Sequence, residues 1–181
     1  ARGELILTTD ADCIMGRQWI SSTVACYEKE KPHMILGPVL YRTTQNRPFG
    51  HFQALEFISL LATSAGAASL KRPLFCNAAN MAFNHEKFKE IKDPLSSGTA
   101  SGDDTMLLLK LKKMYPGSIR FNKDRRALVE TFPEKTLKRF WNQRKMGIKK
   151  QILQGFRHSC RIIHCFWNQS ADSSISCSDV Y

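Results

Sequence analysis

Apolar residues recur along this chain at two spacings, one typical of strands and the other of helices. Alternating or continuous apolar runs, which predict strands, occur at residues 5–9, 34–41, 74–83 and 118–132. Helical spacing, which predicts helices, occurs at residues 16–30, 49–70, 103–114 and from Pro133 onward. Asn84 is the predicted N-cap of a further short helix, and a Ser/Gly-rich loop covers residues 96–102. Strands that alternate with helices predict an α/β fold built in layers.

Charge and composition narrow the class of protein. The chain of 181 residues is long enough for one domain, and its net charge of +11 is concentrated in residues 110–150, with 14 Lys and Arg against 3 Asp and Glu. Such a basic segment suits nucleic acid, anionic lipid or phosphate groups, or is simply a solvated helix face. The six cysteines include no CxxC pair, which argues against a zinc ribbon or a redox motif. No run reaches the ~20 apolar residues of a membrane span.

Two pairs of acidic residues carry candidate chemistry. Asp10 and Asp12 follow the first predicted strand, where their carboxylates can share a Mg²⁺ or Mn²⁺ ion with substrate phosphates. Asp103 and Asp104 open a predicted helix after the flexible loop, where one of them can act as a general base. Each pair also has a purely structural interpretation, because acids are common in surface turns and in the first turn of helices.

Four motifs in order resemble the glycosyltransferases of family 2, which have the GT-A fold. The segment of residues 3–13 resembles the family's strand leading into its DxD motif, and residues 75–83 resemble its donor-pocket segment. Ser101-Gly102-Asp103-Asp104 resembles the ED motif, and residues 141–145 resemble the start of the QxxRW motif. The resemblance implies a partial GT-A fold, with a mixed sheet flanked by helices, over residues 1–145.

The resemblance implies a role for each matching acid. Asp12 would ligate a divalent metal (Mg or Mn), and Asp10 would help to hold the metal or the nucleotide. Asp104 would take the proton from the acceptor hydroxyl, and Asp103 would support the loop or the acceptor. The implied reaction is inverting transfer of a sugar from a nucleotide-sugar donor to a glycan or a lipid-linked acceptor.

Four further residues match the family's binding motifs. Asn77 and Asn80 would contact the donor, while Gln143 and Arg144 would lie at the acceptor side. The same resemblance implies membrane association of the intact protein, at the cytoplasmic face.

Both ends of the chain depart from the family pattern. The DxD motif begins at residue 10, so the nucleotide-binding strands that the family places before it are expected upstream of this chain. Met146-Gly147 stand where Arg-Trp is expected, and a reading frame shifted by one base forces Trp there. With permitted choices of the third codon bases, the shifted frame continues into an apolar run. Residues 146–181 are therefore interpreted as a frameshifted or disordered tail, with a divergent natural tail as the alternative. We expect the chain on its own to be inactive.

Two other functions remain open at this stage. A nucleotidyltransferase of similar fold would also use paired acids and Mg²⁺. A basic nucleic-acid-binding module would use the charge of residues 110–150 with Phe140 and Trp141 interleaved. We expect no nucleic acid partner, because no recognised nucleic-acid motif is present.

Overall fold

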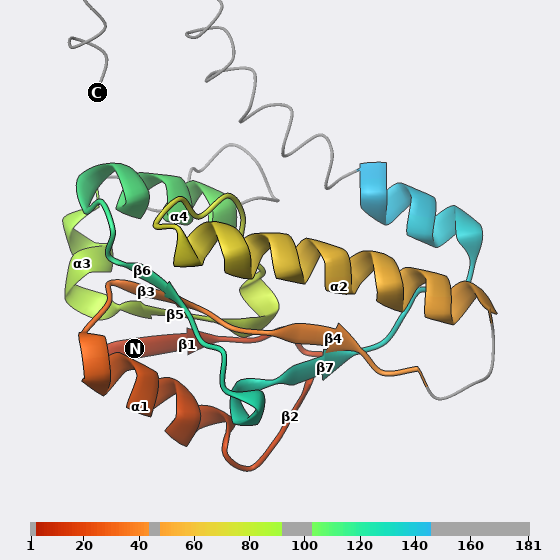
Figure 1. The fold of residues 1–181 in the computed structure, drawn as a ribbon, viewed down its shortest axis with the longest axis horizontal. Coiled ribbons are helices and arrows are strands. Elements are labelled where there is room, and N and C mark those ends of the chain that lie inside the picture. Colours follow the sequence, from red (N-terminus) through yellow and green to blue (C-terminus); the bar gives the residue numbers. More distant parts are fainter. Residues whose placement is uncertain (1–2, 44–47, 92–102, 146–181) are drawn as a thin grey trace, which may run out of the picture. The chain divides into compact units, whose positions relative to one another are not determined.

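A computed structural model describes residues 3–43, 48–91 and 103–145 of the protein (Figure 1). The strands are β1 (Leu5–Thr8), β2 (Ile14–Met15), β3 (Met34–Leu36), β4 (Val39–Tyr41), β5 (Met81–Asn84), β6 (Ile119–Phe121) and β7 (Val129–Thr131). The α-helices are α1 (Trp19–Glu30), α2 (Pro48–Ser69), α3 (His85–Glu90) and α4 (Asp103–Met114), and the short 3₁₀ helices are η1 (Ala78–Asn80) and η2 (Arg125–Ala127). A further helix covers residues 137–145.

The strands form two mixed sheets. The larger sheet has the order β1-β5-β3-β6, in which β5 runs antiparallel to both neighbours and β3 runs parallel to β6. The smaller sheet has the order β2-β7-β4, with β7 antiparallel to β2 and parallel to β4. Within the described residues, β1 is therefore an edge strand, and the Asp10 turn directly follows it.

Helices cover both faces of the larger sheet. Successive side chains of a strand point to opposite faces, so each strand packs against helices on both sides. Met34 and Leu36 of β3 pack in one apolar cluster with Ala68 of α2 and with three leucines of α4, Leu107, Leu108 and Leu111. Ile35, between them, packs on the other face against Tyr27 of α1. Figure 1 shows the resulting layers, with α2 and α4 on one side of the sheet and α1 on the other.

The stretch expected as one strand over residues 34–41 is two strands, so that prediction was wrong. β3 ends at Leu36 and β4 begins at Val39, and each strand belongs to a different sheet. The break falls at Gly37-Pro38, because Pro has no backbone N–H to donate to a ladder. The same two residues therefore join the two sheets.

The expectation of a strand over residues 74–83 was also wrong in its extent. β5 starts at Met81, and η1 precedes it, with the Asn77 side chain accepting a hydrogen bond from the backbone N–H of Ala79. A local side-chain cap thus replaces a strand here, as Asn often does. β2 was not predicted at all, because two residues give no readable period.

Other elements follow the predictions. Asn84 caps α3 by accepting a hydrogen bond from the backbone N–H of Lys87, and α4 spans residues 103–114 as expected. Residues 118–132 hold two strands, β6 and β7. The loop of residues 96–102 and the tail of residues 146–181 lie outside the described residues.

The chain divides into two compact units, the first being Ala1–Glu134 and the second beginning at Lys135. The helix of residues 137–145 belongs to the second unit, and the expected division of the chain after residue 145 stays a prediction. The first unit is an α/β domain of two mixed sheets flanked by helices. None of the helices in the described ranges has the length and hydropathy needed to cross a bilayer.

Candidate metal and acid–base site

The end of β1 is fixed to the segment that precedes β5. The hydroxyl of Thr8 donates to the carbonyl oxygen of Ala78 at 2.8 Å, and it lies 3.2 Å from that of Met81. Beyond Thr8 the chain turns tightly, with the backbone N–H of Cys13 donating to the carbonyl oxygen of Asp10 at 3.2 Å. This turn brings the side chains on either side of Ala11 to the same place.

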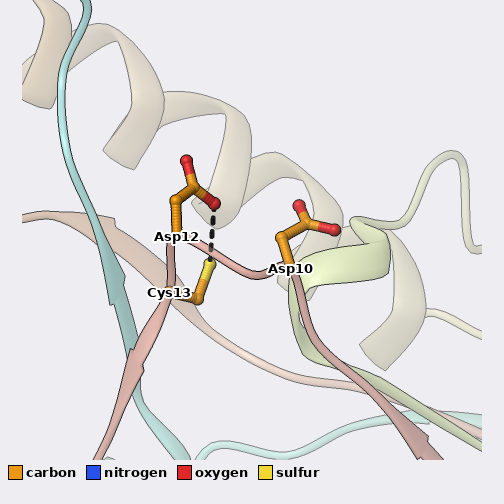
Figure 2. A group of neighbouring side chains, drawn as sticks. All are labelled: Asp10, Asp12 and Cys13. Carbon is orange, nitrogen blue, oxygen red and sulfur yellow. Dashed lines mark hydrogen bonds between the residues drawn. The ribbon is translucent and has the colours of Figure 1, made fainter.

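Three potential metal ligands converge in this turn (Figure 2). One ligand atom each from Asp10, Asp12 and Cys13 lies within 4.8 Å of the others. The Cys13 thiol points at Asp12 and donates to its Oδ1 at 3.9 Å. Asp10 and Asp12 are exposed, while Cys13 is half-buried, so a divalent cation could reach the group directly from solvent.

Asp104 lies close enough to influence this turn from α4. Burial raises the pKa of the Asp10 carboxyl, and the negative charges of Asp12 and then of Asp104 raise this pKa further. The charge of Asp104 thus acts on Asp10, although Asp104 stands more than 90 residues from Asp10 in the sequence. An opposing positive charge would relieve this repulsion, as a divalent metal ion does.

The thiol of Cys13 shares the same electrostatic environment. Burial raises the pKa of Cys13, and the charges of Asp12 and Asp10 add to the rise, against hydrogen bonds that lower it. The thiol is therefore protonated at neutral pH in the metal-free protein, and binding of a thiophilic metal would release its proton.

Asp103 and Asp104 occupy the first turn of α4, as predicted. Asp104 is half-buried, and its Oδ1 accepts a hydrogen bond from the backbone N–H of Thr105 at 2.8 Å. The Asp103 side chain is outside the described part of the structure. Of this pair, Asp104 is the residue that the structure relates to Asp10.

Asn77 and Asn80 lie beside the end of β1 but differ in their surroundings. Asn80 is 4% exposed, and its Oδ1 accepts a hydrogen bond from the indole N–H of Trp19 at 3.0 Å. Its amide nitrogen donates to the carbonyl oxygens of Pro38 at 2.7 Å and Ala127 at 2.8 Å. Both donor hydrogens of Asn80 are thus used inside the fold.

Asn77 is more accessible. It is half-buried, and its Oδ1 caps η1 through the backbone N–H of Ala79 at 3.0 Å. Of the two asparagines, Asn77 therefore has the side chain that is more accessible to a ligand. The predicted donor contacts of both residues stay predictions.

Gly37 was not singled out from the sequence, yet it makes room for Asn80. A Cβ atom at Gly37 would lie 2.3 Å from Cγ of Asn80, closer than packed atoms approach. Cys13 and Trp19 were likewise not assigned to the site. The Cys13 residue lies next to the DxD motif, so its position was visible in the sequence, whereas the Gly37 and Trp19 contacts depend on tertiary packing.

A groove of about 580 Å³ lies on β2 and η2, beyond the turn. Arg17, Arg125 and Arg126 line it together with apolar side chains that include Ile14 and Met15. Arg126 is held by an ion pair with Asp124, at 2.7 Å. No sequence pattern marked this groove, because its two sides lie more than 100 residues apart in the chain.

The predicted acceptor-side residues lie in the second compact unit. Gln143 and Arg144 belong to the helix of residues 137–145, in which Arg144 stacks its guanidinium over the ring of Phe140, with 4.9 Å to the ring centroid. Their relation to the carboxylates stays a prediction.

No protein-family model matches this chain, and a search of curated proteins finds no match either.

Proposed function

We propose that the first unit is the catalytic part of a metal-dependent, inverting glycosyltransferase of family 2 with a partial GT-A fold. The observation that carries this proposal is the grouping of Asp10, Asp12 and Cys13 after β1. Asp104 lies near enough that its charge, after burial and the charge of Asp12, raises the pKa of Asp10. A divalent metal ion and a general base are the two groups that this reaction needs at one place. The mixed sheet with helices on both faces supports the fold assignment.

The residues present fit a divalent cation. Asp10 and Asp12 offer hard oxygen ligands, and Cys13 offers a sulfur ligand within 4.8 Å of them. A bound Mg²⁺ or Mn²⁺ ion would stabilise the negative charge of the leaving nucleoside diphosphate. Asp10 and Asp12 would thereby also hold the diphosphate of the donor.

Asp104 is the proposed general base. It would accept the proton of the acceptor hydroxyl as that oxygen attacks the anomeric carbon from the side opposite the diphosphate, which inverts the configuration. The hydrogen bond from the backbone N–H of Thr105 to Asp104 Oδ1 keeps this carboxylate oriented before the acceptor arrives. The other oxygen of Asp104 would then receive the proton.

The proposed partners are a nucleotide sugar and a glycan or lipid-linked acceptor. Asn77 is the proposed donor contact, whereas Asn80 is engaged inside the fold through its three hydrogen bonds. Gln143 and Arg144 are proposed to contact the acceptor. Membrane association of the intact protein, at the cytoplasmic face, is part of the same proposal.

The metal site is tested on the chain itself by measuring the binding of Mn²⁺. We expect Asp12→Ala to weaken Mn²⁺ binding at least tenfold, because it removes one of two carboxylate ligands. A tenfold loss of affinity corresponds to ~1.4 kcal/mol in binding free energy. Glu28→Gln is the matched control, since Glu28 is an exposed acid of α1 paired with Lys31. Equal Mn²⁺ affinity in Asp12→Ala and Glu28→Gln would contradict the metal site.

The reaction is tested on a protein that also carries the upstream strands that the resemblance implies. We expect Asp104→Asn to reduce metal-dependent sugar transfer by roughly 10²–10⁴-fold, the usual contribution of a general base, and to leave donor binding nearly unchanged. Near-normal turnover of Asp104→Asn would remove Asp104 from this role. Transfer of a nucleotide instead of a sugar would favour the nucleotidyltransferase alternative.

A further inference from the structure

The helix α2 carries very little charge for its length. It has 22 residues, of which only Glu56 is charged. A helix that is apolar on all sides is normally buried on all sides, whereas a helix that faces water carries charged residues on its outer face. Yet only Gln53, Ser64 and Ala68 of α2 are buried in the described structure. Its outer face therefore has the composition of a covered surface.

Large apolar side chains on this outer face are exposed in a line. Phe52, Leu55 and Ile58 follow one another at a spacing of three residues, which places them along one side of a helix. Leu70 lies about five turns beyond Phe52 and so has the same direction. Leu55 is 70% exposed, Ile58 is 47% exposed and Leu70 is 76% exposed. We call Phe52, Leu55, Ile58 and Leu70 the outer stripe.

Basic residues gather at the C-terminal end of the outer stripe. Lys71 and Arg72 follow α2 directly, and both are exposed. Lys112 of α4 donates a hydrogen bond to the carbonyl oxygen of Pro73 at 3.0 Å, which places the end of α4 beside the same segment. Lys113, the next residue of α4, is exposed. We call Lys71, Arg72, Lys112 and Lys113 the basic rim.

We propose that the outer stripe of α2 docks on the surface of an anionic lipid membrane, with the basic rim contacting the lipid headgroups. An uncharged helix face bordered by basic residues is the arrangement with which helices lie in the plane of a membrane interface. No helix in the described residues is long and apolar enough to cross a bilayer. The proposed contact places α2 flat on the membrane surface. This inference assigns a surface to the membrane association in the proposed function, but it does not rest on glycosyl transfer, since lipid binding requires neither donor nor metal.

Electrostatics favour this occupant over a second copy of the chain. The chain has a net charge of +11, and two copies packed through α2 would bring two strongly basic proteins together. An anionic bilayer is instead attracted by the basic rim. The position of α2 agrees with this arrangement, because α1 covers the opposite face of the larger sheet (Figure 1).

The experiment is co-sedimentation of the full chain with phosphatidylcholine vesicles that contain about 30% phosphatidylglycerol, enough to give an anionic surface. We expect Leu55→Glu and Ile58→Glu each to weaken vesicle binding at least about tenfold, because burial of one such side chain contributes roughly 1.5–3 kcal/mol. Ile20→Glu is the matched control: Ile20 is 60% exposed on α1, on the other side of the sheet. We expect Ile20→Glu to reduce vesicle binding less than threefold, which corresponds to a change of less than ~0.7 kcal/mol in binding free energy.

A second substitution tests for a gain of binding instead of a loss. Leu55→Trp should bind the vesicles more tightly than the parent, because Trp favours the membrane interface, and Ile20→Trp should not. Arg72→Glu with Lys113→Glu should remove the preference for anionic over neutral vesicles.

Two results would overturn the proposal. One is equal binding by Leu55→Glu and Ile20→Glu, which would mean that the vesicles attract the protein through its charge alone. The other is a dimer in sedimentation equilibrium without lipid that Leu55→Glu dissociates, which would assign the outer stripe to a second copy. Neither result would bear on Mn²⁺ binding by Asp12, so the failure of this proposal is distinguishable from that of the proposed function.

Discussion

The substitution Asn80→Ala should destabilise the protein far more than its small size suggests. It would remove the partner of two groups, the indole N–H of Trp19 and the carbonyl oxygen of Ala127. The carbonyl oxygen of Pro38 would lose one of its two bonds and keep that from the backbone N–H of Val129. A buried polar group left without a hydrogen bond costs about 1–3 kcal/mol. Because relaxation and water entry reduce the sum for these two groups, we expect a loss of about 2–4 kcal/mol in the free energy of unfolding. That is a large fraction of the 5–15 kcal/mol typical of a domain.

The assay is urea unfolding followed by circular dichroism, with the slope m compared between variants. Asn77→Ala is the matched control, since Asn77 is half-buried and only caps η1. Loss of a cap of this kind typically costs about 1 kcal/mol. Equal losses in the two variants would refute the reasoning. So would a normally stable Asn80→Ala protein that had lost nucleotide binding, which would place Asn80 in the donor site.

Three further predictions follow from the same contacts. Gly37→Ala should lower the free energy of unfolding by about 1–3 kcal/mol, the usual cost of overpacking, and combining it with Asn80→Ala should cost less than the sum in urea unfolding. Asp104→Asn should lower the pKa of Asp10 in a carboxyl NMR titration, because one repelling charge is lost; an unchanged pKa would separate the two residues. Cys13→Ser should weaken Cd²⁺ binding at least tenfold, at ~1.4 kcal/mol per decade, and leave Mn²⁺ binding nearly unchanged, because sulfur prefers soft metals; equal losses for both metals would exclude a sulfur ligand.

The raised pKa of Asp10 also determines the direction in which the stability of the folded protein changes with pH. An acid whose pKa is higher in the folded state binds its proton more tightly there than in the unfolded chain. The metal-free protein should therefore lose stability as the pH rises from the ordinary pKa of 3.8 through the raised value. Mn²⁺ should reverse this loss, because it favours the ionised carboxylates.

Local signals were sufficient for much of the fold. The cap at Asn84 and the helix start at Asp103 depend on residues within one turn, so their sequence pattern predicted them. The break between β3 and β4 also has a local signal, Gly37-Pro38, but the alternating apolar residues on both sides concealed it. The assignment of the two strands to different sheets depends on distant partners, and it could not be read from the sequence.

The candidate site likewise combines features that the local sequence predicts with features that depend on residues far apart in the chain. The closeness of Asp10 and Asp12 follows from their spacing, whereas the proximity of Asp104 was expected from the order of the motifs alone. The buried hydrogen bonds of Asn80 join residues 42, 47 and 61 positions away. No pattern in one sequence distinguishes such a buried amide from one that faces a ligand, so the sequence placed Asn77 and Asn80 in the same category.

The edge position of β1 has a consequence for the motion of the metal-binding turn. Among the described residues, β1 is hydrogen-bonded to β5 on one side only, and Asp10 and Asp12 follow its last residue, Thr8. Edge strands open more readily than central strands, so the turn should sample many arrangements while that edge stays unpaired. A strand added along β1 would narrow this range and raise the affinity for the cation. By thermodynamic reciprocity, a bound cation would tighten the pairing of that strand by the same factor.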